Sequence, residues 1–324
     1  MIFLRPFFHL RSPAGPKARL SVLIFHRVLP EPDPLFPDEI HASRFDELCG
    51  WLANWFNVLP LDLAVARLQA GTLPARAASI TFDDGYADNY HVAMPILQRH
   101  GLTATFFIAT GFLDGGRMWN DTIIETVRAC RATVLDLTAL GLGNHVLGTL
   151  AAKQAAITSL IGQIKYRSVA ERVSITEQLA AQANVQLSQA LMMTSEEVSA
   201  MRRIGMQIGA HTVSHPILAR LTDEQARQEI GDSKLVLEQL LGERVTMFAY
   251  PNGKFGEDYL PQSVEVVSSL GFDVAVSTQS GISSMGDDSL QIKRFTPWDK
   301  SQLRFGIRLL MNLRGALAVN AKKS

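Results

Sequence analysis

Short apolar segments alternate with helix-length amphipathic segments along most of the chain. Residues 19–28 (RLSVLIFHRV), 78–84 (ASITFDD) and 103–110 (TATFFIAT) are rich in β-branched and aromatic residues, which predicts strands. Residues 56–71 read as a strand followed by a helix, and residues 86–101 as a helix that ends at Gly101. Strands separated by helices are typical of parallel βαβ units, so the pattern predicts an α/β fold with a sheet buried on both faces.

The second half of the chain repeats this alternation. Strands are predicted near residues 206–212, 245–251, 272–278 and 290–296, with a long helix that has Thr222 as its N-cap. Between them, residues 119–200 are rich in Ala, Gln and Leu and predict two or three helices, with a short hairpin over 132–147. We therefore expect residues 20–297 to form one barrel-like unit that carries a helical insertion at 119–200, and not two separately folding domains.

Composition narrows the class without deciding the function. The chain has 324 residues, 47% of them hydrophobic, a length that suits either one α/β barrel with insertions or two smaller domains. Lys and Arg together number 31, as do Asp and Glu, so the net charge indicates no nucleic-acid partner. The two cysteines, Cys49 and Cys130, fit no metal-binding spacing and are expected to be buried free thiols.

Positive charge is concentrated at the two ends. Residues 1–19 and 298–324 are basic, and residues 300–324 contain no acid, while Leu303, Ile307 and Leu310 recur at helical spacing. Such a basic amphipathic segment suits contact with an anionic membrane surface, although a terminal helix packed on the barrel would show the same pattern. We expect no secretory signal in the first 20 residues, whose apolar stretches are interrupted by Arg5, Pro6 and Arg11, and no apolar run reaches the roughly 18 residues of a spanning helix. We expect a cytoplasmic protein, with peripheral membrane contact as an open alternative.

Polar side chains suited to chemistry follow several predicted strands. His26, Asp83 with Asp84, His211 and Asn252 each come directly after an apolar run. In parallel α/β folds, ligands bind at the carboxyl ends of the strands, where the loops converge. We therefore expect these side chains to meet at one site.

The segment 211–215 (HTVSH) contains two histidines four residues apart. If the chain turned helically there, both imidazoles would project from one face and bind one ion. Divalent metals with open coordination positions are often held by two histidines and a carboxylate, which Asp83 or Asp84 would supply.

Two adjacent aspartates suit a division of roles. One carboxylate would bind the ion, and its neighbour would accept a proton from the attacking water as general base. The cation would also offset the repulsion between the two charges. Gly85 would allow a sharp turn that brings the substrate close.

TFDDG (81–85) and HTVSH (211–215) together resemble the first two motifs of the polysaccharide deacetylases, the NodB-homology or family-four carbohydrate esterases. The resemblance implies a distorted (β/α)7 barrel and removal of acetyl groups from sugars with a divalent metal, usually zinc. It assigns Asp83 as the general base and Asp84, His211 and His215 as metal ligands.

Two further segments extend the resemblance. FAYPNG (248–253) is similar to the third motif of the family, so Tyr250 and Pro251 would line the substrate groove, and the backbone N–H of Asn252 would stabilise an oxyanion. IFHRV (24–28) resembles a segment of the exopolysaccharide and poly-N-acetylglucosamine deacetylases. His26 would then lie near the metal, or else serve as a core or capping residue.

The chain departs from the family pattern at two positions. Ala249 stands where an arginine usually orients the base, and Arg294 stands where a histidine usually acts as general acid. Arginine does not release its proton at neutral pH, but Arg294 could pair with Asp83 in place of the missing arginine. The leaving amine would take its proton from His26, from protonated Asp83 or from water.

Aromatic and polar residues ahead of the insertion offer further substrate contacts. Trp119 could stack on a sugar ring while Asn120 or Asp121 contacts hydroxyls, and Trp298 is a second aromatic candidate. Each could equally be a core or interface residue.

The sequence thus predicts a metal-dependent hydrolase that removes an N-acetyl group from a sugar in a polysaccharide or glycan precursor. Two alternatives stay open. One is hydrolysis of a non-sugar amide or imide, and the other is a glycan-binding relative that keeps the metal site but has little or no turnover.

Overall fold

Parallel strands form a nearly closed barrel in the computed structural model, which describes residues 4–314. In spatial order the strands are β1 (Arg19–Phe25), β3 (Ala77–Phe82), β4 (Thr105–Ile108), β7 (Gln207–Ala210), β8 (Met247–Ala249), β9 (Val274–Ser280) and β11 (Ile292–Arg294). A parallel bridge from Phe295 to Leu23 brings the last strand back to the first. This arrangement confirms the predicted distorted barrel of seven parallel strands.

Two short strands extend the sheet at its ends. The strand β2 (Asn57–Val58) pairs in parallel with the beginning of β3, and β10 (Ser283–Ser284) pairs antiparallel with the beginning of β1. Both lie at the amino ends of the barrel strands, away from the edge where Asp83 emerges.

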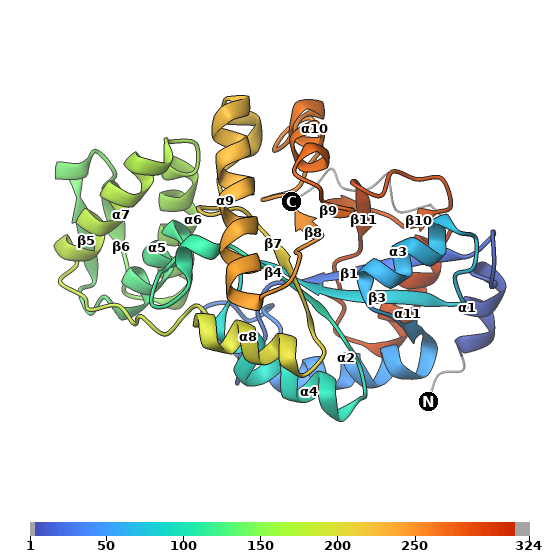
Figure 1. Cartoon of the computed structure of the whole chain (residues 1–324). Helices are drawn as coiled ribbons and strands as arrows, with labels where there is room; N and C mark the ends of the chain where they lie inside the picture. Colours follow the sequence, from blue (N-terminus) through green and yellow to red (C-terminus); the bar gives the residue numbers. More distant parts are fainter. Residues whose placement is uncertain (1–3, 315–324) are drawn as a thin grey trace.

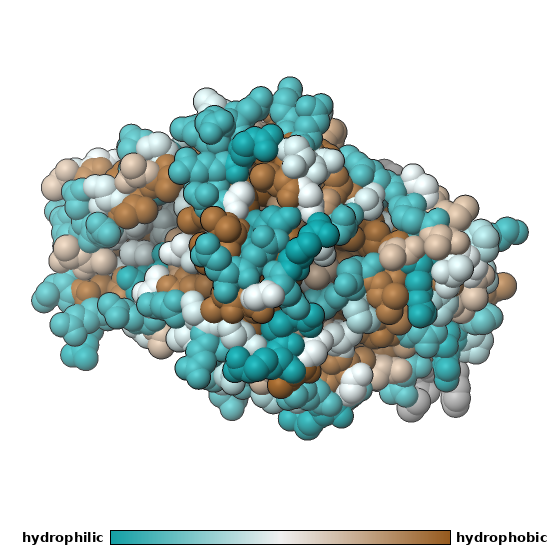
Figure 2. All heavy atoms as spheres, in the orientation of Figure 1, coloured by the Kyte–Doolittle hydropathy of each residue, from teal (hydrophilic) through white to brown (hydrophobic). Residues whose placement is uncertain are grey.

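Helices cover the outside of the barrel (Figure 1). They are α2 (Ala42–Trp55), α3 (Leu61–Gln69), α4 (Met94–Arg99), α8 (Ser195–Arg203), α9 (Asp223–Leu241) and α10 (Pro261–Ser269), with a π-helical turn η1 (Asn89–Ala93) before α4. Thr222 caps α9 in a capping box, as the sequence predicts, and Gly242 ends the helix with a positive φ of 69°. Three short 3-10 helices are η2 (Thr110–Phe112), η3 (Thr138–Leu140) and η4 (Leu218–Arg220). The face of the molecule shown in Figure 2 is mostly hydrophilic, with scattered apolar patches.

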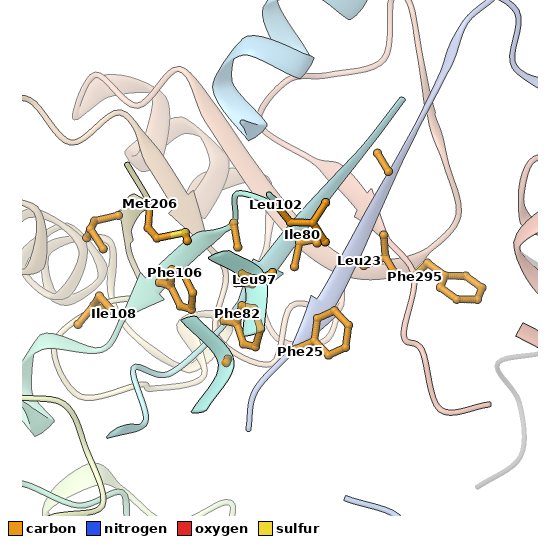
Figure 3. Close-up of a cluster of buried hydrophobic side chains, with 14 of the residues drawn as sticks. Leu23, Phe25, Ile80, Phe82, Leu97, Leu102, Phe106, Ile108, Met206 and Phe295 are labelled. Carbon is orange, nitrogen blue, oxygen red and sulfur yellow. The ribbon is translucent and has the colours of Figure 1, made fainter. Parts of the chain in front are cut away.

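The main core lies between the strands and the helices α2 and α4. Phe82 stacks on Phe25 at a ring-centroid distance of 5.2 Å and on Phe106 at 4.8 Å, so one aromatic row crosses β1, β3 and β4 (Figure 3). Because successive strand residues face opposite sides, Thr81 and Asp83 point the other way, into the barrel. Packing of the phenylalanines therefore fixes the register that delivers Asp83 to the inside.

The insertion forms a lobe at one end of the molecule (Figure 1). It contains α5 (Trp119–Ala129), the predicted hairpin of β5 (Val134–Leu137) and β6 (Gly143–Val146), α6 (Leu150–Ile164) and α7 (Val169–Gln182). These elements share a hydrophobic cluster of their own, which includes Ile123, Leu160 and Leu179. The next helix, α8, buries Val198 and Met201 in the main core of the barrel.

The terminal helices pack on each other. α1 (Arg5–Arg11) contacts α11 (Gln302–Asn312), and both bury phenylalanines, Phe8 and Phe305, against Trp55. Residues 315–324 of the predicted basic segment lie outside the described residues. Within residues 4–314 no helix is long and apolar enough to span a membrane. Cys49 and Cys130 are free and buried, as predicted.

Candidate metal centre and active site

The polar residues predicted at the strand ends converge at the carboxyl edge of the barrel. Asp83 and Asp84 follow β3, His211 follows β7 and Asn252 follows β8, while Arg294 ends β11. The sheet order places β3, β4, β7 and β8 side by side, so these loops share one rim.

Asp84, His211 and His215 form a compact cluster. The Oδ1 atom of Asp84 lies 3.4 Å from Nε2 of His211 and 3.6 Å from Nε2 of His215. The three potential ligand atoms all lie within 4.8 Å of one another, and the two imidazole rings are in edge-to-face contact. A metal ion at bonding distance from all three atoms fits this spacing.

The hydrogen bonds around the cluster favour a cation over a simple polar contact. Nδ1 of His211 donates to the carbonyl oxygen of Ala249 at 2.7 Å, so its Nε2 is left as an acceptor. Asp84 Oδ1 is buried and has no hydrogen-bond partner. Acceptors that face one another with no donor between them are costly unless a cation lies among them. The residues present therefore fit a divalent metal.

The loop that carries the two histidines is not helical, contrary to the condition under which the sequence placed them on one face. Thr212 and His215 have positive φ values of 66° and 51°, so the chain makes a tight left-handed turn. The carboxylate of Glu229 on α9 accepts hydrogen bonds from the backbone N–H groups of Val213 and Ser214, at 3.0 and 2.8 Å, and from the Ser214 hydroxyl. This turn, and not helical periodicity, brings the imidazoles together.

Left-handed backbone is concentrated at this site. Besides Thr212 and His215, Asp84 has a φ of 78° and Asn252 a φ of 59°, and all four are non-glycine residues. Such conformations are uncommon and cost energy, so they persist only where the surrounding structure holds them. At Gly253 the need for glycine is absolute, because a Cβ atom would lie 2.7 Å from the backbone nitrogen of Thr278.

Asp83 is held by a buried bidentate ion pair. Nη1 and Nη2 of Arg294 donate to its two carboxylate oxygens, each at 2.7 Å, and the side chains are 3% and 0% exposed. Nε of Arg294 donates to the carbonyl of Ser277 at 2.8 Å. The pairing of Arg294 with Asp83 that the sequence suggested is thus confirmed, with Arg294 entering from β11 in place of the arginine absent at position 249.

The charges of the site set the pKa values of its members. Burial alone would raise the pKa of Asp83, but the Arg294 guanidinium and then His211 lower it overall. Burial likewise opposes ionisation of Asp84, yet the two histidines hold its pKa below the usual range. Burial lowers the pKa of His215 to about 4, whereas Asp84 and Asp83 outweigh burial at His211 and raise its pKa. Asp83, Asp84 and His215 are therefore deprotonated at neutral pH, and a metal ion would take the place of the proton that Asp84 and Asp83 favour on His211.

Only some residues of the third predicted motif, 248–253, lie where the substrate would bind. Asn252 is half-buried and lines a cavity of about 210 Å³ with Asp84 and His215. Among the described residues, its backbone N–H makes no backbone hydrogen bond, so it is free to donate to a ligand. Pro251 is buried beside it.

Tyr250 does not line the groove, and that prediction needs correction. Its side chain is 0% exposed and its ring stacks on Tyr259 at a centroid distance of 3.8 Å. The alternation of side chains along the strand turns this ring into the core, so Tyr250 serves packing.

Two cavities meet at the candidate metal centre. Asp84 lines both the 210 Å³ cavity, with Trp119 and Asn120, and a larger cavity of about 620 Å³. His26, Asp121 and Trp298 line the larger one. His26 and Trp298 are exposed, whereas Asp121 is buried. The aromatic and polar residues singled out in the sequence thus line cavities that reach the candidate metal centre at Asp84.

A buried charged network next to the site was missed by the sequence reasoning. Arg27 pairs with Asp88 at 2.8 Å and lies over the ring of Tyr86, whose hydroxyl donates to Asp121 at 3.0 Å. Burial raises the pKa of Asp121 to about 7. These residues could have been noticed in the sequence because they stand next to the motifs: Arg27 follows His26, and Tyr86 and Asp88 follow Gly85. Nothing in the sequence shows that they meet.

The chain belongs to the polysaccharide deacetylase family, which it matches over residues 70–133 and 144–275. These ranges contain the aspartate pair, both histidines and Asn252. The family consists of hydrolases that act on carbon–nitrogen bonds other than peptide bonds. A relative in Bacillus subtilis (strain 168), YxkH, is itself assigned to the polysaccharide deacetylases. It is 22% identical over 269 residues, which span 82% of this chain and 67% of YxkH.

Solved deacetylase structures share the fold. The deacetylase PplD of Streptococcus pyogenes superposes with a TM-score of 0.61 at 20% identity, over 91% of this chain and 98% of that one. IcaB of Ammonifex degensii gives 0.59 at 17% identity, over 94% and 98%. A de-N-acetylase from Aggregatibacter actinomycetemcomitans gives 0.58 at 17% identity, over 90% and 99%. At these identities the likeness supports the barrel architecture.

Proposed function

We propose that this chain is a metal-dependent deacetylase that removes the N-acetyl group of a sugar within a polysaccharide or a glycan precursor. The observation that carries the proposal is the cluster of Asp84, His211 and His215, three facing acceptors beside the buried Asp83–Arg294 pair. A divalent ion, with zinc the best match to two imidazoles and one carboxylate, would polarise the acetyl carbonyl and the attacking water when bound.

The residues of the chain supply the remaining steps. Asp83 accepts the proton of the attacking water, and Arg294 keeps that carboxylate ionised and fixed in orientation. The free backbone N–H of Asn252 donates to the oxyanion that develops on the acetyl group. Protonated Asp83 or His26 then returns a proton to the leaving amine. The product carries a free amino group, which adds positive charge to the glycan.

Acetate release tests this proposal directly. Purified protein is treated with chelator, reloaded with zinc and incubated with N-acetylglucosamine oligomers. We expect acetate from the wild type, and a fall of at least about 100-fold for Asp83→Asn because a general base is lost. Glu243→Gln, which removes a carboxylate from an exposed ion pair on the barrel surface, is the control and should match the wild type.

Two results would contradict the assignment. Full activity of Asp83→Asn would show that Asp83 is not the general base. Zinc binding without acetate release from any acetylated glycan would favour a glycan-binding protein over an enzyme.

We also infer that the terminal helices contact an anionic membrane surface. Leu303, Ile307 and Met311 recur at four-residue spacing on α11 and are 50%, 45% and 41% exposed, on the side away from the buried Phe305 and Leu309. The neighbouring helix α1 exposes Phe7 and Leu10. Neither helix contains an acidic residue. An apolar stripe flanked by arginines suits the headgroup region of an anionic bilayer.

A further inference from the structure

Arg172, on helix α7 of the insertion, is a buried cation that no acid of the described chain neutralises. The residue is 5% exposed, and its Nε has no hydrogen-bond partner. Within residues 4–314 no carboxylate lies within ion-pair distance of it. Its guanidinium lies over the ring of Trp119, 5.2 Å from the centroid. Burial without a counter-ion lowers the pKa of Arg172, which reflects an unfavourable site for a charge.

The acid that acts on Arg172 most strongly is already engaged. Glu229 influences the guanidinium, but its carboxylate oxygens accept three hydrogen bonds from Val213 and Ser214 in the histidine loop. Glu229 therefore holds the metal-centre loop and is not free to turn towards Arg172. The guanidinium of Arg172 therefore keeps hydrogen-bond donors that no group within residues 4–314 accepts from.

Arg172 borders the candidate active site. Arg172 lines the 210 Å³ cavity together with Asp84, His215 and Asn252, and Lys165 brings a second cation to the same space. Among residues 4–314, Asp84 is the one acid that lines this cavity, so the two cations outnumber it there even without a metal. Arg172 and Trp119 also line an adjoining cavity of about 410 Å³. The two together extend from the metal centre along the insertion.

We propose that Arg172 and Lys165 form an anion subsite, which binds a phosphate or carboxylate group on the sugar next to the acetylated one. This proposal rests on the deacetylase function proposed above and specifies its substrate class as an acidic glycan. A planar guanidinium pairs with two oxygens of either group, and the exposed part of Trp119 offers a face for the sugar ring that carries it. The subsite belongs to the insertion, whereas the metal ligands belong to the barrel.

Binding measurements on metal-free protein test the subsite independently of turnover. The chelator-treated full chain is titrated calorimetrically with an N-acetylglucosamine disaccharide, with the matched disaccharide that carries a uronic acid, with the one that carries a phosphate, and with inorganic phosphate alone. We expect one or both acidic disaccharides to bind about 10- to 100-fold more tightly than the neutral one, as a buried charge-assisted pair predicts. The tighter acidic ligand identifies the anion.

Substitutions test whether Arg172 causes the preference for acidic disaccharides. Arg172→Gln should abolish the preference for the acidic ligand, and Arg172→Lys should keep part of it. Arg117→Gln is the matched control. It removes the same charge from the adjoining cavity, but that guanidinium already donates to Thr122 and Ser188, so the preference should persist.

Three outcomes would overturn the subsite. These are equal affinity of the wild type for neutral and acidic disaccharides, an undiminished preference in Arg172→Gln, and binding of inorganic phosphate as tight as that of the disaccharide phosphate. The first needs no variant, so a folding defect cannot obscure it. Acetate release is measured separately, so failure of the deacetylase proposal is distinguished from failure of the subsite.

Discussion

Replacing Arg294 with methionine leaves the carboxylate of Asp83 buried without its cation. Both side chains are almost fully excluded from solvent, at 0% and 3% exposure, and they are joined by two bonds of 2.7 Å. Removing one partner of such a pair costs about 3–5 kcal/mol in the free energy of unfolding at neutral pH. The same change at Arg202, whose pair with Glu243 is 40% and 43% exposed, should cost no more than about 1 kcal/mol.

The cost should depend on pH with a definite sign. Because Arg294 contributes to lowering the pKa of Asp83 in the folded protein, the pair stabilises the fold above the unfolded pKa of about 3.9 and loses this contribution as the pH falls through the folded value. The difference between wild type and Arg294→Met should therefore shrink in acid. In the variant, burial should raise the pKa of Asp83 and shift the acidic limb of the pH–activity profile upward.

Urea unfolding of chelator-treated protein, followed by tryptophan fluorescence, measures these free energies. The double variant Asp83→Asn/Arg294→Met removes both charges and should be more stable than Arg294→Met alone by about 1–3 kcal/mol. A loss below about 1 kcal/mol in Arg294→Met, or strictly additive effects of the two substitutions, would refute the reasoning that the buried carboxylate depends on this arginine.

Three further predictions concern the loop, the buried acid and the terminal helices. Glu229→Gln should weaken zinc binding about 10- to 100-fold, because the histidine loop loses a charged acceptor, and calorimetric titration with zinc that finds unchanged affinity would contradict this. Asp121→Asn should raise the melting temperature more at pH 8 than at pH 5. The pKa of Asp121 is about 7 in the folded protein, well above its unfolded value. The free energy of unfolding therefore falls, by up to about 4 kcal/mol, as the pH rises from about 4 to 7 and the buried carboxylate ionises. Equal shifts of the melting temperature at both pH values would exclude that titration. Ile307→Glu should reduce sedimentation with phosphatidylserine vesicles several-fold, whereas Leu235→Glu, at a residue 52% exposed on α9, should not; equal binding by both variants would rule out α11 as the contact.

The sequence was sufficient for the parts of the fold that depend on local pattern. Strand ends could be located from apolar runs, and the convergence of Asp83, Asp84 and His211 followed from the geometry of parallel sheets. The partner of Asp83 could be proposed from the family resemblance, because Arg294 stands where the last motif usually has a histidine while the usual arginine is absent at position 249. The turn at 211–215 could not be predicted, because it depends on left-handed residues held by Glu229, which lies 14 positions beyond His215.

Arg172 shows most clearly what the sequence alone could not predict. In the sequence it is one of several charged positions on an amphipathic helix, and nothing nearby marks it as buried. Its environment exists only once α7 packs against Trp119 of α5. The error for Tyr250 is the reverse. Its motif suggested exposure to the substrate, whereas the alternation of side chains along the strand directs its ring into the core.

The separate hydrophobic cluster of the insertion has an evolutionary consequence. Residues that face only this cluster, such as Ile123 on α5 and Leu179 on α7, can vary without disturbing the packing of β3, β7 and β8, which precede Asp84, His211 and Asn252. Under the subsite proposed above, the catalytic residues lie on the barrel and the residues that choose the glycan lie on the insertion, with separate hydrophobic clusters beneath them. Exchanging the lobe between relatives is then the shortest route to a deacetylase with a new substrate and an unaltered catalytic rim.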